Sequence, residues 1–346
     1  MITEYIDLRS DTLTRPTDAM RQAMAQASVG DDVFAEDPTV NLLQQKVAAL
    51  LGKPAALYVP SGVMSNQLAI KSQTQPGDEV IVEQDSHIFN YETAAPSILS
   101  NVQLHVIPGE RGILRAGQLA PAVRPSVYYM PRTSLICLEN THNRAGGTIY
   151  PIEEIKKIRD FARAVGIKLH LDGARLWNAS VASGISPLEY AQHFDTVSVC
   201  FSKGLGAPVG SALVGPDDVI QRARRFRKIL GGGMRQAGII AAGALYALEH
   251  HIDRLKEDHE KARLFAERVS QNPLIGVDLK YVQTNIVVLD IARTGKTTGE
   301  LLDLLKSKQV LMSDANYTSL RAVTHLDVTT DQVVRAADIV ASSFKF

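Results

Sequence analysis

The sequence predicts an α/β fold in which a large domain with a mostly parallel sheet is followed by a smaller α+β domain. Short runs rich in apolar and β-branched residues alternate with amphipathic segments over residues 16–201, which is typical of parallel strands joined by helical crossovers. The runs that end at Leu171 and Phe201 show little polar alternation, as expected for strands buried on both faces. With 346 residues, the chain has room for about two domains.

The elements of the large domain follow one another in a regular order along the chain. The expected helices cover residues 16–27, residues 41–51, a segment that ends near Ser72, residues 151–165 and residues 174–183. The expected strands are Ala55–Val59, Glu79–Glu83, Gln103–Ile107, Ser134–Leu138, Lys168–Leu171 and Thr196–Phe201. Because crossovers between such strands are right-handed, the strands should lie parallel with helices on both faces of the sheet.

The last part of the chain has a different pattern. Residues 216–271 are largely helical, and residues 273–346 are expected to form strand, helix, strand and helix. The two strands expected there are Asn285–Ile291 and Leu320–Thr324. We therefore predict a large domain over residues 1–250 and a small α+β domain over residues 251–346. No Pro-, Gly- or Ser-rich linker separates them, so we expect the domains to pack tightly.

The balance of charge excludes some classes of partner. Lysine plus arginine and aspartate plus glutamate both count 37, so the formal net charge is zero. A nucleic-acid binder needs a basic excess and an anionic membrane attracts a cationic surface, so we expect neither partner. The segment Met1–Arg9 carries acids where a signal peptide needs basic and then apolar residues. Since no apolar stretch reaches the ~18 residues of a membrane span, we expect a cytoplasmic protein.

The sequence offers no pattern of metal ligands, and we expect no metal site. Cys137 and Cys200 lie inside apolar, strand-like runs and are expected to be core residues, because no CxxC spacing is present. His250, His251 and His259 belong to a charged helical segment and are expected to be solvated.

Two predicted strand ends carry unusual chemistry. Asp172 closes one buried strand, and Lys203 follows directly on the next. Because the carboxyl ends of parallel strands line the ligand crevice of an open sheet, both side chains should point into one cleft. Such a pair suits pyridoxal phosphate (PLP), since a lysine can hold the cofactor aldehyde and an aspartate can keep the pyridine nitrogen protonated. A buried Asp–Lys ion pair that supports the fold explains the pair equally well.

A phosphate group needs backbone N–H donors, and the segment Ser61–Val63 offers them. It joins a predicted strand to a helix, where the first N–H groups of the helix can bind an anion, and Ser202 can add a hydroxyl. An ordinary helix-capping turn explains the same residues. The segment Gly231–Arg235 is a second glycine-rich helix start with a cation, and a flexible hinge is the alternative interpretation.

His87 and His142 each follow a predicted strand, so both belong to the same edge of the sheet. An imidazole at that edge can stack on a pyridine ring or transfer protons near neutral pH, although many loop histidines have no such role. Arg321 lies on a late strand and can bind a substrate carboxylate through two parallel hydrogen bonds. An arginine at the protein surface is the alternative interpretation of Arg321.

Taken together and in this order, these residues resemble the L-threonine aldolase family of fold-type I PLP enzymes, in its low-specificity branch. The similarity is carried by Asp7–Thr12, Gly30–Phe34, Glu36–Thr39, Val59–Gly62, Asp85–Ile88, Glu139–Asn143, His170–Arg175, Ser202–Leu205, Gly231–Gln236 and Arg321–His325. These segments extend over nearly the whole chain. The resemblance implies a fold-type I architecture, whose large domain has a mostly parallel sheet of seven strands flanked by helices.

The resemblance also implies roles for single residues at the cofactor. Lys203 would carry the cofactor as a Schiff base, Asp172 would face the ring nitrogen, and His87 would stack on the ring. Arg175 would approach the 3-hydroxyl group of the ring. The phosphate would be held by Ser61, Gly62, Val63 and Ser202 and, from a neighbouring subunit, by Arg235.

The same resemblance implies a substrate site and a reaction. Ser10, Arg175 and Arg321 would bind the substrate carboxylate beside His87. The reaction would be the retro-aldol cleavage of L-threonine, L-allo-threonine and related β-hydroxy-α-amino acids to glycine and an aldehyde, as in threonine catabolism and glycine biosynthesis. The catalytic base is left open between His87, His142 and a water molecule. The protein would be a homotetramer, built as a dimer of dimers with shared active sites.

Two departures from the family pattern bear on these roles. Phe34-Ala35 stands where the family usually has tyrosine-glycine, and Val63 stands where it usually has threonine, so each position lacks a hydroxyl. Two other functions fit the same residues. One is another fold-type I PLP enzyme, such as a β-eliminating lyase or an aminotransferase. The other is a non-catalytic binding protein in which Asp172 and Lys203 form a structural ion pair.

Overall fold

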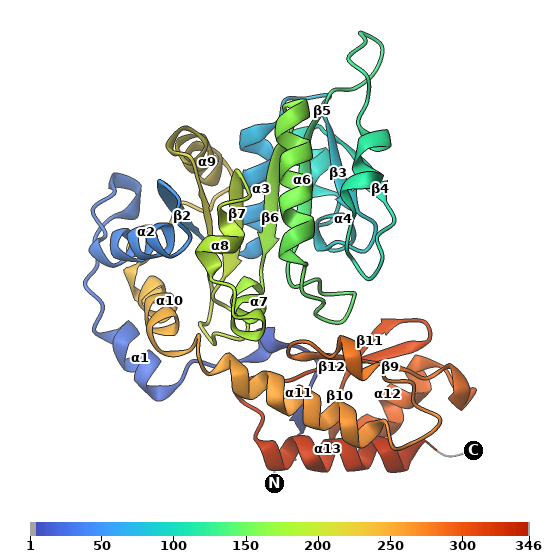
Figure 1. The fold of residues 1–346 in the computed structure, drawn as a ribbon. Helices are drawn as coiled ribbons and strands as arrows, with labels where there is room; N and C mark the ends of the chain where they lie inside the picture. Colours follow the sequence, from blue (N-terminus) through green and yellow to red (C-terminus); the bar gives the residue numbers. More distant parts are fainter. Residues whose placement is uncertain (1–4, 345–346) are drawn as a thin grey trace.

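A sheet of seven strands forms the centre of the computed structural model, which describes residues 5–344 (Figure 1). Along the sheet, the strands follow the order β2-β8-β7-β6-β5-β3-β4. Their bounds are Ala55–Val59 (β2), Glu79–Glu83 (β3), Gln103–Ile107 (β4), Thr133–Glu139 (β5), Lys168–Gly173 (β6), Thr196–Cys200 (β7) and Ser211–Gly215 (β8). Every neighbouring pair from β4 to β7 is parallel, whereas β8 runs antiparallel to both β2 and β7. The prediction of a mostly parallel sheet is therefore confirmed.

Helices cover both faces of this sheet, as the alternating pattern predicts. In the view of Figure 1, α3 (Gly62–Gln73) packs against β6, β7 and β8 behind the sheet, and α6 (Ile152–Val165) crosses in front of it. Further α-helices of this part are α1 (Asp18–Ala25), α2 (Pro38–Leu50), α4 (His87–Asn90), α5 (Ala116–Leu119), α7 (Leu176–Ser183), α8 (Pro187–Ala191), α9 (Asp217–Ile229) and α10 (Gly238–His250). Within residues 5–344, no helix has the length and apolar character needed to cross a bilayer.

A second, smaller sheet lies at the other end of the molecule (Figure 1). Its strands are antiparallel and follow the order β11-β12-β9. The elements of this part are β9 (Ile286–Asp290), β11 (Ser313–Asn316), β12 (Ser319–Val323), α11 (Leu255–Val269), α12 (Thr298–Ser307) and α13 (Thr330–Ser343). Helices and strands alternate here as the sequence predicts. The predicted domain boundary after residue 250 falls at the end of α10 and stays a prediction.

The first described residues pack with this smaller part of the molecule. β1 (Ile6–Asp7) pairs in parallel with β10 (Val310–Leu311), and the N–H of Val323 donates to the carbonyl of Leu8 at 2.8 Å. Leu8 is buried in one apolar cluster with side chains of α11, α12 and α13. This docking places Arg9 beside β12 and so brings the start of the chain to one side of the candidate site.

The predicted strands agree with the structure more closely than the other predicted elements do. The strands expected at 55–59, 79–83 and 103–107 match β2, β3 and β4 residue for residue. The structure adds β8, which the sequence did not indicate. The predicted solvation of His251 is wrong, because its ring is buried and its Nδ1 lies 2.7 Å from the carbonyl of Leu205.

Ala35, one of the two departures from the family pattern, has a left-handed backbone. Its φ is 61° and its ψ is 29°, a conformation that costs a residue with a Cβ about 1–2 kcal/mol and costs glycine little. We expect Ala35→Gly to raise the free energy of unfolding in urea by about 0.5–1 kcal/mol. The control is Ala49→Gly, an exposed position in α2 where glycine lowers stability by about 1 kcal/mol. A loss of stability in Ala35→Gly would contradict the prediction.

Candidate active site

The carboxyl ends of β6 and β7 bring Asp172 and Lys203 to one edge of the sheet. Asp172 pairs in register with Ser198 of β7, so the loop that carries Lys203 begins beside it. Asp172 is buried and Lys203 is half-buried. Within residues 5–344, Nζ of Lys203 has no hydrogen-bond or ion-pair partner, and the carboxylate of Asp172 is held by other groups. This geometry disfavours a structural ion pair and leaves the lysine amine available for chemistry.

Asp172 is held in its ionised form. Its Oδ1 accepts the N–H of Ala174 at 3.0 Å, and its Oδ2 accepts the side-chain amide of Asn66 at 2.8 Å. Burial opposes the charge, but the charges of His87 and Lys203 and the Asn66 hydrogen bond hold the pKa of Asp172 below its ordinary value. Because a carboxylate has about four lone-pair sites, Asp172 can accept a further N–H donor, such as a protonated pyridine nitrogen.

His87 lies next to Asp172, at the first residue of α4. Its backbone N–H donates to Oε2 of Glu139 at 2.7 Å, and its Nδ1 lies 2.9 Å from Oε1 of Glu92. Burial opposes protonation, but the Glu92 hydrogen bond and the charges of Asp172 and Glu139 raise the pKa of His87 above its ordinary value. One donor or acceptor atom from each of His87, Glu92 and Asp172 lies within 4.8 Å of the other two. The ring therefore stands at the same sheet edge, as expected.

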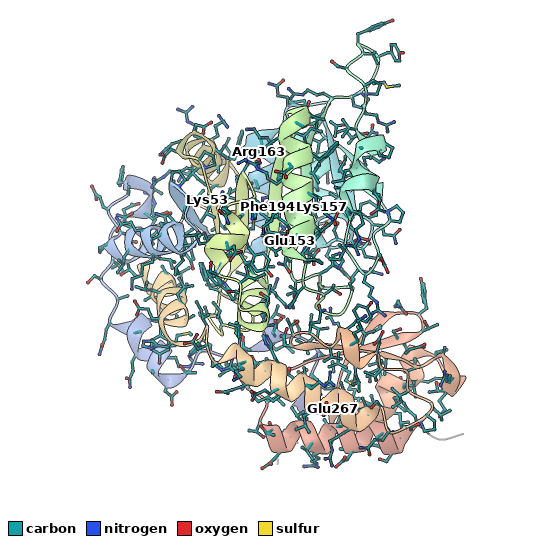
Figure 2. All side chains as sticks on the ribbon, in the orientation of Figure 1. Lys53, Glu153, Lys157, Arg163, Phe194 and Glu267 are labelled. Atoms are coloured by element: carbon teal, nitrogen blue, oxygen red, sulfur yellow. The ribbon has the colours of Figure 1, made fainter. Side chains whose placement is uncertain are left out.

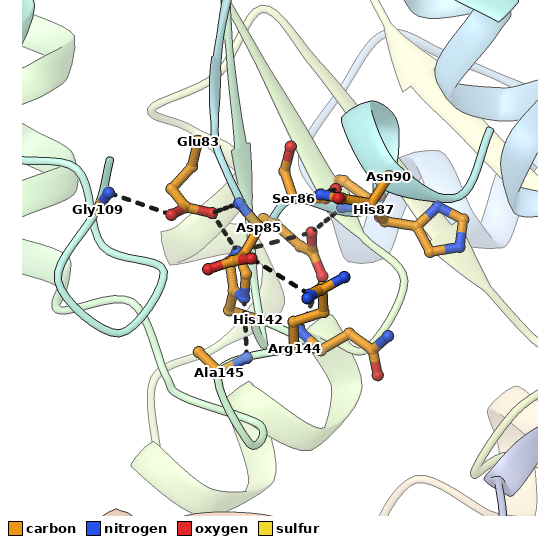
Figure 3. Close-up of polar contacts among 12 residues, drawn as sticks. Glu83, Asp85, Ser86, His87, Asn90, Gly109, His142, Arg144 and Ala145 are labelled. Carbon is orange, nitrogen blue, oxygen red and sulfur yellow. Dashed lines mark hydrogen bonds and ion pairs between the residues drawn. The ribbon is translucent and has the colours of Figure 1, made fainter. Parts of the chain in front are cut away.

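His142 lies in the neighbouring loop but is enclosed (Figure 3). Its side chain is fully buried, its Nε2 lies 3.0 Å from Oε2 of Glu83, and its Nδ1 accepts the N–H of Ala145 at 3.3 Å. A Cβ on Gly112 would lie 2.3 Å from the ring, so the chain packs tightly against it. Both ring nitrogens thus have protein partners, which leaves neither for a substrate.

The predicted phosphate site lies where α3 begins. The Ser61 hydroxyl caps the helix by accepting a backbone N–H of the first turn at 3.2 Å, and the first N–H groups of a helix have no partner within it. A Cβ on Gly62 would lie 2.8 Å from Sγ of Cys200, the last residue of β7. The glycine therefore lets the helix start close to the loop that carries Ser202. The N–H groups of Gly62 and Val63, the Ser202 hydroxyl and the helix dipole suit an anion.

Two of the residues predicted to bind a carboxylate, Arg175 and Arg321, meet at Asn143, whereas the Ser10 hydroxyl accepts from Thr12. The Nη1 atoms of Arg321 and Arg175 both donate to Oδ1 of Asn143, at 3.0 and 3.3 Å. Nη2 of Arg321 donates to the carbonyl of Arg9, the residue before Ser10, at 3.3 Å. Nε of Arg321 is buried without a partner among the described residues. A guanidinium with an unfilled donor fits a carboxylate ligand.

The comparison with known proteins adds a family to this geometry. The model of the family described as beta-eliminating lyase matches the sequence over residues 7–292. The chain belongs to the beta-eliminating lyase family. Low-specificity L-threonine aldolase 1 of Arabidopsis thaliana is 42% identical over 339 residues, which cover 96% of this chain and 94% of that protein. The low specificity L-threonine aldolase of Escherichia coli strain K12 is also 42% identical, over 96% of this chain and 97% of that protein. The resemblance seen in the motifs is thus confirmed.

Solved structures confirm the fold of this beta-eliminating lyase. The threonine aldolase of Leishmania major superposes with a TM-score of 0.85 at 18% identity, covering 98% of this chain and all of that one. A serine palmitoyltransferase of Sphingomonas wittichii superposes with a TM-score of 0.75 at 16% identity, covering 98% of this chain and 87% of that one. At such low identity the likeness concerns the fold alone, and it confirms the fold-type I architecture. The family and this fold are PLP-dependent.

In this beta-eliminating lyase, Arg175 has a partner that the sequence did not reveal. Its Nε and Nη2 donate to the carboxylate of Asp11 at 2.8 and 2.6 Å, and both side chains are buried. Burial opposes the charge of Asp11, but the charges of Arg175 and Lys203 and a hydrogen bond from Asn285 hold its pKa well below the usual range. The pairing leaves only Nη1 of Arg175 to face Asn143.

Within one chain, Arg235 lies apart from the other predicted site residues. Its Nη1 pairs with Oδ2 of Asp31 at 2.8 Å, and its side chain is 56% exposed. Among residues 5–344 it makes no hydrogen bond or ion pair to another predicted site residue. Its role in a site shared between subunits stays a prediction.

Several side chains that contact the predicted site residues of the lyase were not anticipated. They are Asp11, Asn66, Glu92 and Asn143. Asp11 and Asn143 directly follow Ser10 and His142 in the sequence. This adjacency to predicted site residues could have identified them. Asn66 had no such signal, since its partner Asp172 is brought to it only by the packing of α3 against the sheet. Glu92 lies five residues after its partner His87, but no motif marked it.

Proposed function

We propose that this chain binds PLP and cleaves L-threonine, L-allo-threonine and related β-hydroxy-α-amino acids to glycine and an aldehyde. The observation that carries the proposal is the pair of an ionised Asp172 and the Lys203 amine, which has no partner among residues 5–344, at one sheet edge. The similarity to low-specificity L-threonine aldolases over 96% of the chain supports the substrate class.

The residues at the sheet edge fit the separate parts of PLP. Lys203 would hold the aldehyde, Asp172 would accept the ring N–H, and His87 would stack on the ring. The start of α3 at Ser61–Val63 and the Ser202 hydroxyl would hold the phosphate. When bound, PLP supplies an electron sink for the bonds at Cα of an amino-acid substrate.

The arginines orient the substrate. Arg321 offers an Nε that has no partner within residues 5–344, and Arg175 adds its remaining Nη1, so the two guanidinium groups bind the substrate carboxylate with the help of Ser10. Fixing the carboxylate would restrict rotation about the Cα–N bond of the bound amino acid, so that Cα–Cβ becomes the bond aligned for cleavage. Arg175 would also approach the 3-hydroxyl side of the ring.

Of the two candidate bases, the geometry supports His87. Its ring is half-buried, its Nδ1 is oriented by Glu92, and its Nε2 has no partner among residues 5–344. His142 has both nitrogens engaged inside the protein. We therefore assign removal of the β-hydroxyl proton to Nε2 of His87, directly or through a water molecule.

The pH dependence of the reaction tests this assignment. His87 must lose its own proton before it can accept one, and its pKa is raised above the ordinary value of about 6.5. We expect kcat/KM for L-threonine to rise with pH through a midpoint above about 6.5. His87→Asn should lower kcat/KM by about 100-fold and abolish its rise with pH. His142→Asn should keep the rise with pH. If the rise persists in His87→Asn, the assignment is refuted.

The products decide between this reaction and the alternatives within the fold. Purified protein with PLP is incubated with L-threonine, L-allo-threonine and L-phenylserine, and the products are identified. Glycine and an aldehyde support the aldolase. Ammonia and an α-keto acid would support a β-eliminating lyase reaction instead, and transfer of the amino group would support an aminotransferase.

Val63 gives a prediction for the phosphate site. It stands in the first turn of α3, where a threonine hydroxyl would add one hydrogen bond to the phosphate. We expect Val63→Thr to tighten PLP binding by about 1 kcal/mol, or about fivefold in Kd. The Kd is measured by titrating the apoenzyme with PLP. An unchanged Kd would contradict the prediction.

We also propose a homotetramer, a dimer of dimers in which Arg235 reaches the phosphate site of a neighbouring subunit. Large apolar side chains are exposed on Ile229 and Ile239, close to Arg235 in the sequence, and on Phe34, three residues after its ion-pair partner Asp31, which supports a covered surface there. Mixed oligomers of Arg235→Ala and Lys203→Ala chains should regain activity that neither variant has alone. Oligomers that stay inactive would argue against a shared site.

The compartment we propose is the cytoplasm, with a role in threonine catabolism and glycine supply.

A further inference from the structure

Asn66 lies one helical turn along α3 from Gly62, and all of its polar atoms have partners. Its Nδ2 donates to Oδ2 of Asp172 and to Oε1 of Glu92, both at 2.8 Å. Its Oδ1 lies 3.1 Å from Nε2 of His170. One buried amide therefore touches two carboxylates and a histidine, and the proposed reaction has so far used the two carboxylates without the group that joins them.

A hydrogen-bond chain behind His170 fixes the direction of the Asn66 amide. The Gln73 amide donates to the Thr196 hydroxyl at 2.8 Å, and that hydroxyl keeps its own hydrogen free to donate to Nδ1 of His170, 2.9 Å away. Burial lowers the pKa of His170 to about 4, so the ring is neutral at pH 7 and carries one hydrogen. Because Oδ1 of Asn66 can only accept, that hydrogen lies on Nε2. That hydrogen points at Oδ1 of Asn66, which turns both amide hydrogens toward the carboxylates.

The carboxylates of Asp172 and Glu92 form a crowded group with His87. One atom of each side chain lies within 4.8 Å of the other two, and both carboxylates are buried. Two anions this close repel each other, and one of such a pair commonly retains a proton. A proton on Asp172 would make it a poor partner for a protonated pyridine nitrogen, which the electron sink requires.

We propose that Asn66 is a positioning residue that keeps Asp172 ionised beside the Glu92 carboxyl group and so maintains the protonation of the cofactor ring. The inference rests on the proposed function. Glu92 also has donors in Gln67 and His87, whereas Asn66 is the only side-chain donor to Asp172 among residues 5–344. Loss of Asn66 therefore acts mainly on Asp172.

The other ionisable groups near these carboxylates do not replace Asn66. Five other ionisable groups interact electrostatically with this cluster. They are His87, Lys203, His170, Glu139 and Cys137. Burial keeps the His170 ring and the Cys137 thiol neutral, since it lowers the pKa of the first and raises that of the second. Glu139 adds negative charge, which increases the need for hydrogen-bond donors.

The test compares two holoenzyme variants from one turn of α3. Asn66→Leu keeps the branched shape of the side chain and removes its donors. Ser65→Ala removes a buried hydrogen bond to Ser198 of 2.7 Å and touches neither carboxylate. For Asn66→Leu we expect kcat for L-threonine to fall about tenfold or more, with KM within about threefold of wild type. The absorption maximum of bound PLP should also move to shorter wavelength.

The control separates this role from a merely structural one. Ser65→Ala should keep the wild-type spectrum and a kcat within about threefold of wild type. Asn66→Ser, whose hydroxyl is too short to reach both carboxylates, should behave like Asn66→Leu and serves if the leucine variant does not fold. A wild-type spectrum and kcat in the Asn66 variants, or equal changes in Ser65→Ala, would overturn the inference and leave the proposed function intact. A wild-type protein that binds no PLP would overturn both.

Discussion

Replacing Lys203 with alanine is expected to lower aldehyde release from L-threonine by at least about a thousandfold. The reason is geometric. Nζ of Lys203 has no partner among residues 5–344, and the ionised Asp172 stands at the end of the neighbouring strand. No other lysine is expected to reach the aldehyde of a cofactor whose ring nitrogen is fixed at Asp172. The variant should also lose the visible absorption of the bound cofactor.

Lys53 provides a matched control for Lys203. It is also a partly buried lysine, and its Nζ donates to the carbonyl of Phe194 (Figure 2). Phe194 lies two residues before β7, at the amino end of that strand, whereas Lys203 follows the carboxyl end. Burial lowers the pKa of Lys53 to about 8, so its amine loses its proton more readily than an ordinary lysine does and could react with an aldehyde in solution. We expect Lys53→Ala to keep both the absorption and the activity. Full activity in Lys203→Ala, or loss of the absorption in Lys53→Ala instead, would refute the assignment.

Removing the carboxylate of Asp11 is expected to have the largest effect on stability. Asp11→Ala leaves Arg175 buried without its counter-ion, and breaking such a pair costs about 3–5 kcal/mol. The free energy of unfolding is measured in urea. Asp7→Ala is the control, because Asp7 pairs with an Arg9 side chain that is 49% exposed, and such a pair contributes less than about 1 kcal/mol.

The double variant Asp11→Leu, Arg175→Met separates the pair from its surroundings. Replacing both charges by apolar groups of similar volume should restore most of the lost stability, since no unpaired charge is left buried. Activity should not return, because Nη1 of Arg175 is then missing from the carboxylate site. If Asp11→Ala loses no more stability than Asp7→Ala, the ion pair is not a major support of the fold.

The effect of Asp11 should also depend on pH. The pKa of Asp11 is lower in the folded protein than in the unfolded chain, so its stabilisation is complete above the ordinary value of about 3.9 and is lost as the pH falls further. The stability difference between wild type and Asp11→Ala should therefore be constant between about pH 5 and 8 and shrink below about pH 4. A stability difference between wild type and Asp11→Ala that grows as the pH falls would contradict the prediction.

The predictable part of the fold is the part governed by local patterns. β2, β3 and β4 are short apolar runs between turn residues, and such runs are recognisable in one sequence. β8 is equally buried, but it follows a glycine-rich loop and is antiparallel to its neighbours. No helix precedes it in the pattern of alternating strands and helices, so that pattern did not predict it. β1 and β10 span two residues each, which is too short to show a period.

The candidate site divides in the same way. Asp172 and Lys203 could be predicted because each ends a strand, and the topology of a parallel sheet brings strand ends together. The partnership of Asp11 with Arg175 could not, because 164 residues separate them. His142 shows the converse limit, since its place after a strand suggested a base and only the packing of Gly112 shows that its ring is enclosed.

The pairing of β1 with β10 has a consequence for the order in which the site is made. β1 is synthesised before every other described element, and its partner at Val310–Leu311 is synthesised after most of them. The carbonyl of Arg9, which Arg321 contacts, reaches the site through this docking. A nascent chain that has passed Lys203 thus holds the cofactor-facing groups but has no completed carboxylate site. Substrate recognition is therefore assembled last in translation.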